Sequence, residues 1–177
     1  MPEYKPITLK EFVEEIQKGS RDFTYRTLTG SRNLEVAGLE ELNNYLRSLE
    51  PAQLKESPVA ISYSFFQGLK AHRIYLPHLR GIEARLQEAD LRGADLKEAN
   101  FWGADLWRAD LRRANLYRTD LWKANLWRAD LRGVHNLEYA FLSGESFRHT
   151  VVTKKEKAII EAAMKRENLF IVKPLEE

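Results

Sequence analysis

The chain of 177 residues contains no cysteine, which excludes disulfide bonds, thiolate metal sites and a cysteine nucleophile. It contains no apolar run long enough for a signal peptide or a membrane span, so we expect no membrane partner. It also has no large charge imbalance, because 28 Lys and Arg residues oppose 26 Asp and Glu residues. With 44% hydrophobic residues, the sequence predicts a folded protein rather than a disordered chain. The absence of cysteine fits a reducing compartment, so we expect a cytoplasmic protein.

A five-residue repeat occupies residues 84–133. Ten consecutive units read ARLQE ADLRG ADLKE ANFWG ADLWR ADLRR ANLYR TDLWK ANLWR ADLRG. The third residue is Leu in nine units and Phe101 in the tenth, and the first is Ala in nine units and Thr119 in the other. The second is Asp or Asn in nine units, with Arg85 as the exception. Such a strict register indicates a repeat architecture.

A period of five fits neither a straight helix nor a straight strand. In an α-helix, at about 100° per residue, successive leucines would spiral around the axis instead of forming one stripe. In a strand, an odd period would move each leucine to the opposite face. The chain must therefore turn once per unit, which predicts a solenoid. The third residue and the small first residue face its interior, and the other three face outward.

These units resemble the pentapeptide-repeat family, whose pattern is A[D/N]LXX. The resemblance implies an all-β solenoid, namely a right-handed quadrilateral β-helix with four units in each coil. Counting back by fives from Leu86 predicts degenerate units over 59–83. Downstream, Asn136 and Phe141 keep the central, inward position loosely until the pattern ends near Phe147. We therefore expect about 4–5 coils.

Helices are predicted at both ends of the solenoid, where they would cover apolar layers and unpaired strand edges. Thr8 and Glu11 form a capping-box pattern ahead of apolar residues at helical spacing, which predicts an N-terminal capping helix within residues 1–20. The same pattern starting at Thr153 predicts a C-terminal helix, followed by a tail, within residues 149–177.

Between these ends, residues 21–148 are predicted to form the β-helix, with the regular repeats at 84–133. We expect one interruption in its wall. Leucines at helical spacing run from Leu39 to Leu49. A short helix and a loop over about 39–58 are therefore predicted to form a helical insertion.

All four tryptophans lie in the repeat, at the outward fourth position of their units. With four units in each coil, they fall into two ladders that run along the solenoid. The first tryptophan ladder comprises Ile82, Trp102, Trp122 and Leu142. The second comprises Gln67, Gln87, Trp107 and Trp127 with the adjacent Arg108 and Arg128. Outward apolar patches mark partner sites, so the four tryptophans, Ile82, Arg108 and Arg128 are the predicted partner-binding site. The alternatives are cover by a flanking helix, stacking with neighbouring arginines, or burial in a symmetric homodimer.

A third outward ladder carries alternating charges. It comprises His72, Arg92, Arg112 and Arg132, with Asp90, Asp110 and Asp130 in parallel. The aspartates would largely neutralise the arginines, which disfavours nucleic-acid binding. Because Asp or Asn recurs in nearly every unit, a hydrogen bond to the turn explains these carboxylates better than catalysis does. The four histidines have no metal-ligand spacing, so the sequence predicts no catalytic residue, no metal and no cofactor.

The sequence predicts a non-catalytic protein, a rigid scaffold for a protein partner of unknown identity or for a second copy of itself. The alternative comes from the resemblance, since some pentapeptide-repeat proteins protect DNA gyrase from quinolones with a negative surface that resembles duplex DNA. The basic repeat faces and short solenoid of this chain depart from that pattern. A gyrase- or topoisomerase-interacting or nucleic-acid-binding protein is the second hypothesis, and an enzyme with a site at the insertion is a weaker third.

Overall fold

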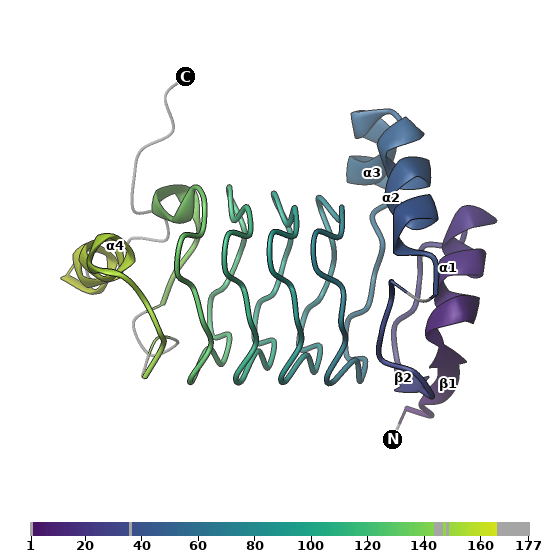
Figure 1. The fold of residues 1–177 in the computed structure, drawn as a ribbon, viewed down its shortest axis with the longest axis horizontal. Helices are drawn as coiled ribbons and strands as arrows, with labels where there is room; N and C mark the ends of the chain where they lie inside the picture. The colour runs from purple at the N-terminus through teal and green to yellow at the C-terminus, as the bar shows by residue number, and fades with distance from the viewer. Residues whose placement is uncertain (1, 36, 144–146, 148, 166–177) are drawn as a thin grey trace.

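A computed structural model shows the chain as a stack of coils with helices at both ends (Figure 1). The structure describes residues 2–35, 37–143, 147 and 149–165. In chain order, the helices and strands are β1 (Lys5–Thr8), α1 (Leu9–Gln17), β2 (Arg26–Thr29), α2 (Leu39–Ser48), α3 (Pro51–Glu56), the 3-10 helix η1 (Leu137–Tyr139) and α4 (Lys154–Lys165). Helices α1 and α2 lie at one end of the stack and α4 lies at the other. The repeats fill the length between them.

Residues 60–135 repeat one local conformation every five residues. Each unit makes a parallel backbone bridge at its second residue and turns at its fourth and fifth residues. The bridges join residues 20 positions apart, as between Asp90 and Asp110 and between Asp110 and Asp130. Since four turns separate two bridged residues, the chain completes one coil in four units.

A hydrogen bond closes each turn, and the fifth residue adopts a positive φ. The amide of Ala94 donates to the carbonyl of Leu91 at 3.1 Å, and equivalent bonds recur along the repeat. Gly93, Gly103 and Gly133 suit this position because glycine has no Cβ. The other units from residue 73 to residue 128 carry a long polar side chain there, namely Arg73, His78, Glu83, Glu88, Glu98, Arg108, Arg113, Arg118, Lys123 and Arg128. The turns therefore place these side chains at the outer corners of the coils.

The first and third residues of the units form the core, as predicted. From Leu86 to Leu131, every third-position side chain is at most 4% exposed. Each buried leucine contributes about 1.5–3 kcal/mol to stability, so the repetition itself supplies the core. Gly81 occupies a third position without a side chain, and a Cβ built on it would lie 2.9 Å from the ring of Phe101. Phe101, one coil further along, therefore fills the space that Gly81 leaves.

The degenerate units over 59–83 follow the same register as the regular ones. Ala60 bridges Arg80, again 20 residues away. The preceding coil differs, because Asp22 bridges Ala60 across 38 residues. This spacing exceeds the usual 20 by 18 residues, which is the length of segment 39–56. That segment projects from the coil and forms α2 and α3. Helix α3 lies where the sequence suggested a loop.

A buried amide holds α2 against the wall of the solenoid. Asn43 Nδ2 donates to the carbonyl of Arg73 at 3.1 Å, and its Oδ1 accepts from the amide of Tyr75 at 2.8 Å. The guanidinium of Arg47 lies 5.0 Å from the centroid of the Tyr75 ring. The insertion is thus fixed beside the corner that carries Arg73.

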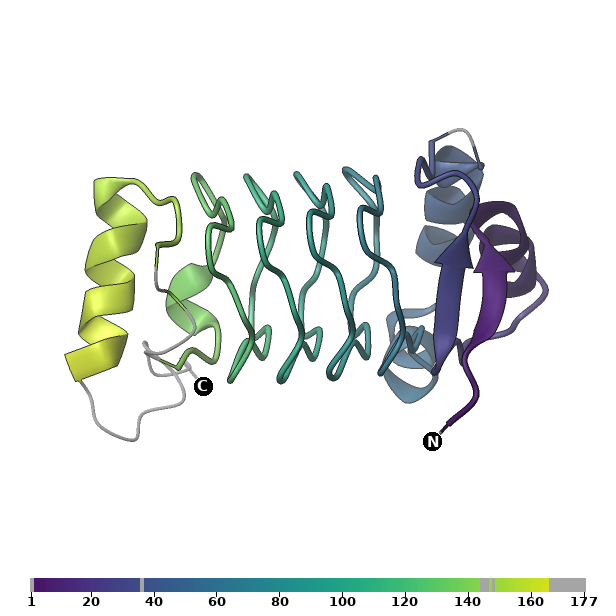
Figure 2. The same ribbon diagram turned by 90° about the horizontal axis from the view of Figure 1, so that it is seen from below.

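The N-terminal end is covered by α1, which follows a strand that the sequence did not predict. This strand, β1, pairs in parallel with β2 (Figure 2). The predicted capping box is present, since the Glu11 amide donates to Thr8 Oγ1 at 3.2 Å and the Thr8 amide donates to Glu11 at 2.8 Å. Phe12 packs edge-on against Phe23 and Phe66, with ring centroids 4.6 and 5.4 Å away. Helix α1 thereby closes the apolar end of the stack.

At the C-terminal end, the phase of the repeat shifts by one residue. Asp120 bridges Phe141, which is 21 positions further along instead of 20. The shift falls at Asn136, which has a positive φ directly before η1. The predicted inward positions of Asn136 and Phe141 are therefore wrong. Leu137 and Leu142 are buried in their place, so the predicted outward position of Leu142 in the first tryptophan ladder is also wrong.

Helix α4 covers the last coil. It begins after Thr153, whose amide and hydroxyl both donate to the carboxylate of Glu156. Ile160 is buried, and the helix packs on η1. The tail predicted after this helix falls in 166–177, outside the described residues. Within the part of the chain that the structure describes, no helix is long and apolar enough to cross a membrane.

Candidate binding surfaces

The second residue of each unit holds the following turn in place. The amide oxygen of Asn100 accepts from the backbone N–H of Trp102 at 2.9 Å. The same bond occurs in nine consecutive units, from Asp90 to Asp130. The Asp and Asn ladders are therefore structural, as their recurrence indicated. Among the described residues, no group of three His, Cys, Asp or Glu side chains could hold a metal ion.

The second tryptophan ladder is a stack of rings and guanidinium groups. The rings of Trp107 and Trp127 are nearly parallel, with an angle of 7° and centroids 6.4 Å apart. Arg108 lies over Trp107 at 4.8 Å, and Arg128 lies over Trp127 at 4.3 Å. On Trp127, His149 adds an edge-on contact at 5.8 Å. The ladder is thus ordered by its own side chains, each indole being partly exposed.

The first tryptophan ladder is held by a lysine. Lys123 Nζ lies 4.9 Å from the centroid of the Trp102 ring and 5.8 Å from that of Trp122. Trp122 is 36% exposed, whereas Ile82 and Trp102 are half-buried. At this ladder a lysine lies over the indoles in place of the arginines that the sequence suggested. These contacts leave part of each apolar surface open to a partner.

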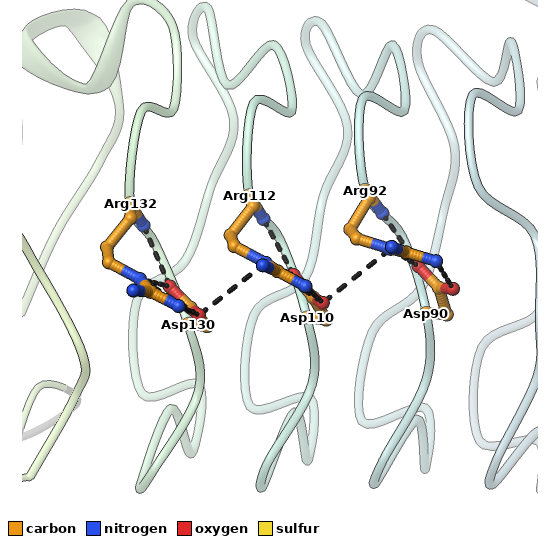
Figure 3. Close-up of polar contacts among 6 residues, drawn as sticks. All are labelled: Asp90, Arg92, Asp110, Arg112, Asp130 and Arg132. Carbon is orange, nitrogen blue, oxygen red and sulfur yellow. Dashed lines mark hydrogen bonds and ion pairs between the residues drawn. The ribbon is translucent and has the colours of Figure 1, made fainter.

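The third ladder is a continuous chain of ion pairs (Figure 3). Arg92 donates from Nε and Nη2 to the two carboxylate oxygens of Asp90, at 2.8 and 2.6 Å. Its Nε also lies 3.6 Å from Oδ2 of Asp110 in the next coil. Arg112 repeats this arrangement between Asp110 and Asp130. The aspartates therefore neutralise much of the positive charge of this ladder, as expected.

The pKa shifts of these carboxylates depend on whether an arginine follows two residues later. Burial raises the pKa of Asp90, but the hydrogen bonds from Arg92 outweigh burial and hold the pKa below its ordinary value. The balance is the same at Asp130. Asp120 is followed by Trp122 instead of an arginine, and burial raises its pKa above the ordinary value. The surroundings of Asp120 thus disfavour its charged form.

A hollow of about 740 Å³ runs along the third ladder, and the sequence reasoning did not find it. We call it the arginine groove; its lining residues are His72, Arg73, Arg92, Gly93, Arg112, Arg113, Arg132 and Gly133. One signal was present in the sequence. At the fifth position of this corner, arginine and glycine alternate from coil to coil. Each glycine leaves a gap beside an arginine of the neighbouring coil.

Residues 82–113 and 109–148 match the family model of pentapeptide repeats, in eight copies. Residues 82–148 are thus shown to carry pentapeptide repeats. The resemblance inferred from the A[D/N]LXX pattern is confirmed. The match extends past the last regular unit at residue 133, so the family pattern continues across the phase shift.

Three solved proteins are similar to parts of the chain. HetL from the cyanobacterium Nostoc, which is involved in heterocyst differentiation regulation, is 26% identical with a TM-score of 0.59, and the match covers 77% of this chain and 50% of HetL. A pentapeptide repeat protein of the Arabidopsis thaliana thylakoid lumen is 32% identical with a TM-score of 0.40, over 50% and 58% of the chains. QnrB1, a plasmid-mediated fluoroquinolone resistance protein, is 15% identical with a TM-score of 0.32, over 58% and 62%. The match thus spans half the length of HetL, and no curated protein matches the sequence.

In this pentapeptide-repeat solenoid the predicted partner-binding residues form two groups. Trp107, Trp127 and their arginines make one stack, and the first ladder runs along the adjoining corner. The two ladders therefore flank one side of the solenoid.

Proposed function

We propose that this pentapeptide-repeat protein is a non-catalytic scaffold that binds a protein partner through its two tryptophan ladders. The scaffold is the right-handed quadrilateral β-helix of about four to five coils that the family resemblance implies. One observation carries the proposal. Four partly exposed indoles, each with a Lys or Arg over its ring, lie on two adjoining corners of a rigid stack. Trp and Arg are the side chains that contribute most to binding at protein interfaces.

A second copy of this chain is one partner that fits. The ladders run straight along the solenoid axis, so a twofold axis can bring the same ladders of two copies together. A different protein with an apolar, acidic-rimmed surface is the other, because the cations over the indoles would meet its carboxylates. Both forms of the proposal require the indoles at the interface.

Double variants that remove both tryptophans of one ladder test the proposal. Trp102→Ala/Trp122→Ala and Trp107→Ala/Trp127→Ala are each expected to weaken binding by about 30-fold or more, as for interface hot spots. Quantitative pull-down from the native cell measures binding to another protein, and light scattering over a range of concentrations measures self-association. Tyr117→Ala removes an aromatic residue from the same repeat position on another corner and is the matched control.

Unchanged capture and an unchanged oligomeric state in both double variants, with thermal melting that shows them folded, would overturn the proposal. A gyrase supercoiling assay and a DNA mobility shift at low salt address the second hypothesis. We expect no effect of the wild-type protein in either assay. Inhibition of gyrase or a shifted band would favour that hypothesis instead.

A further inference from the structure

The arginine groove lies on a different corner of the solenoid from either tryptophan ladder, and it adjoins the corner of the second ladder because Trp107 and Arg112 occupy consecutive units. Two of the four units in a coil separate Trp102 from Arg112, so the groove occupies the corner diagonally opposite the first ladder. Arg92 and its equivalents form the floor of the groove, where Figure 3 shows them in a row. Arg73 and Arg113 come from the neighbouring fifth position. The groove therefore shares none of its lining residues with the surface assigned above.

Glycines keep the groove open. A Cβ on Gly93 would lie 3.4 Å from Cγ of Arg73, and a Cβ on Gly133 would lie 3.7 Å from Cγ of Arg113. The stems of the two arginines therefore lie close over the glycines of the next coil. A larger residue at either glycine would fill the hollow and would also be strained, because both glycines have a positive φ.

The groove presents hydrogen-bond donors that nothing in the described part of the chain uses. Each floor arginine donates to its aspartate from Nε and Nη2, and no hydrogen bond from Nη1 occurs within the described residues. The guanidinium groups of Arg73 and Arg113 form no ion pair with any described residue. Five lining arginines against the three ladder aspartates and Glu35, whose carboxylate lies 2.8 Å from His72 Nε2, leave a net charge of +1. The charge is thus small, but the free donors are many.

This combination fits carboxylates spaced along an extended chain better than it fits a nucleic acid. Three aspartates in the floor repel a dense row of phosphates, which a duplex carries at about one charge per 1.7 Å. No Phe, Tyr or Trp lies among the described residues that line the groove, and His72 is the one ring there that could stack on a base. Arg73 and Arg113 are two coils apart, about 10 Å at strand spacing. Alternate side chains of an extended peptide are about 6.6–6.8 Å apart, so a few residues span both arginines.

We propose that the arginine groove binds an extended acidic segment of a protein partner. Carboxylates of that segment accept hydrogen bonds from Arg73 and Arg113 at the rim and from Nη1 of the floor arginines. Guanidinium groups suit this task because they bind carboxylates through paired, charge-assisted hydrogen bonds. The floor aspartates hold the arginines in a row beforehand, so little side-chain entropy is lost on binding.

Calorimetric titration with a short peptide of alternating Glu and Ser, at low salt, tests the proposal on the full chain. The same peptide with Gln in place of Glu is the ligand control. Arg73→Gln/Arg113→Gln is expected to weaken binding of the Glu peptide by at least about tenfold, since hydrogen bonds to charged groups contribute about 1.5–3 kcal/mol each. Arg80→Gln/Arg118→Gln removes the same charge outside the groove and should leave binding near wild type.

If both double variants lost the same affinity for the Glu peptide, binding would be due to general electrostatic attraction and the proposal would be overturned. So would binding of the Gln peptide as tightly as the Glu peptide, or no binding of the Glu peptide to the wild-type chain. A short oligothymidylate that binds more tightly than the Glu peptide, and loses affinity in Arg73→Gln/Arg113→Gln, would reassign the groove to nucleic acid. Melting curves show whether the variants are folded, and neither rim arginine has an ion pair to lose among the described residues.

Discussion

The regular units over 84–133 and the degenerate units over 59–83 build the same coil from different residues. Both make bridges at 20-residue intervals. The third position is almost always Leu in the first set, whereas it holds Ile, Phe, Ala, Leu and Gly in the second. The coil therefore does not require one residue type at each inward site. It requires that neighbours along the axis together fill the interior, because protein cores are close-packed.

Gly81 and Phe101 give the sharpest test of this sharing. Gly81→Leu would restore the family residue, yet we expect it to lower the free energy of unfolding by about 3 kcal/mol, because Phe101 already fills the site. Chemical denaturation measures the loss. Phe101→Leu alone should cost below about 1.5 kcal/mol. The double variant should recover most of the stability, and simple additivity of the two losses would contradict shared packing.

Ser64 departs from the family alanine at the first position of a degenerate unit. Its buried Oγ donates to the carbonyl of Phe23 at 2.6 Å and accepts from the amide of Arg26 at 2.9 Å. Ser64→Ala would remove the partner of both groups. We therefore expect a loss of about 1–3 kcal/mol in the free energy of unfolding, measured by urea denaturation.

Thr119 is the matched control for Ser64, since it is the buried exception at the first position of a regular unit. Its hydroxyl donates to the carbonyl of Leu96 at 2.9 Å, and this carbonyl also accepts from the amide of Ala99 at 3.0 Å. Thr119→Ala therefore leaves the carbonyl paired and should cost less than Ser64→Ala. Equal losses would show that burial of the hydroxyl, rather than its partners, determines the cost.

The sequence predicted the coil because one inward leucine per unit makes the period of five visible without any long-range information. It could not predict β1, since a strand of four residues before a helix has no repeat to identify it. The phase shift at Asn136 was missed because Phe141 fits the old register as well as Leu142 fits the new one. The outward positions of the tryptophans followed from the period. The stacking of Trp107 on Trp127 depends on side-chain rotamers, which a period does not determine.

The choice between Asp and Asn at the second position is the smallest difference between units, and the environment determines its effect. Asp120→Asn keeps the oxygen that accepts from the amide of Trp122. It removes the carboxyl group, whose pKa is raised by burial. We expect a gain of about 0.5 kcal/mol in the free energy of unfolding near pH 7. A raised folded pKa makes the ionised form costly, so the gain should vanish as the pH falls to about 3.9, the pKa of unfolded Asp.

Asp90→Asn is the same change at a site with the opposite shift. Its folded pKa lies below the ordinary value because Arg92 donates to it, so the ionised form stabilises the protein at pH 7. The substitution should therefore lower stability at neutral pH. The deficit should persist down to about pH 3.9 and shrink only below it, as the folded carboxyl takes up its proton. Denaturation at several pH values distinguishes the two variants. If both variants changed the free energy of unfolding in the same direction at pH 7, the effect of a charge at the second position would not depend on the residue at the fourth position.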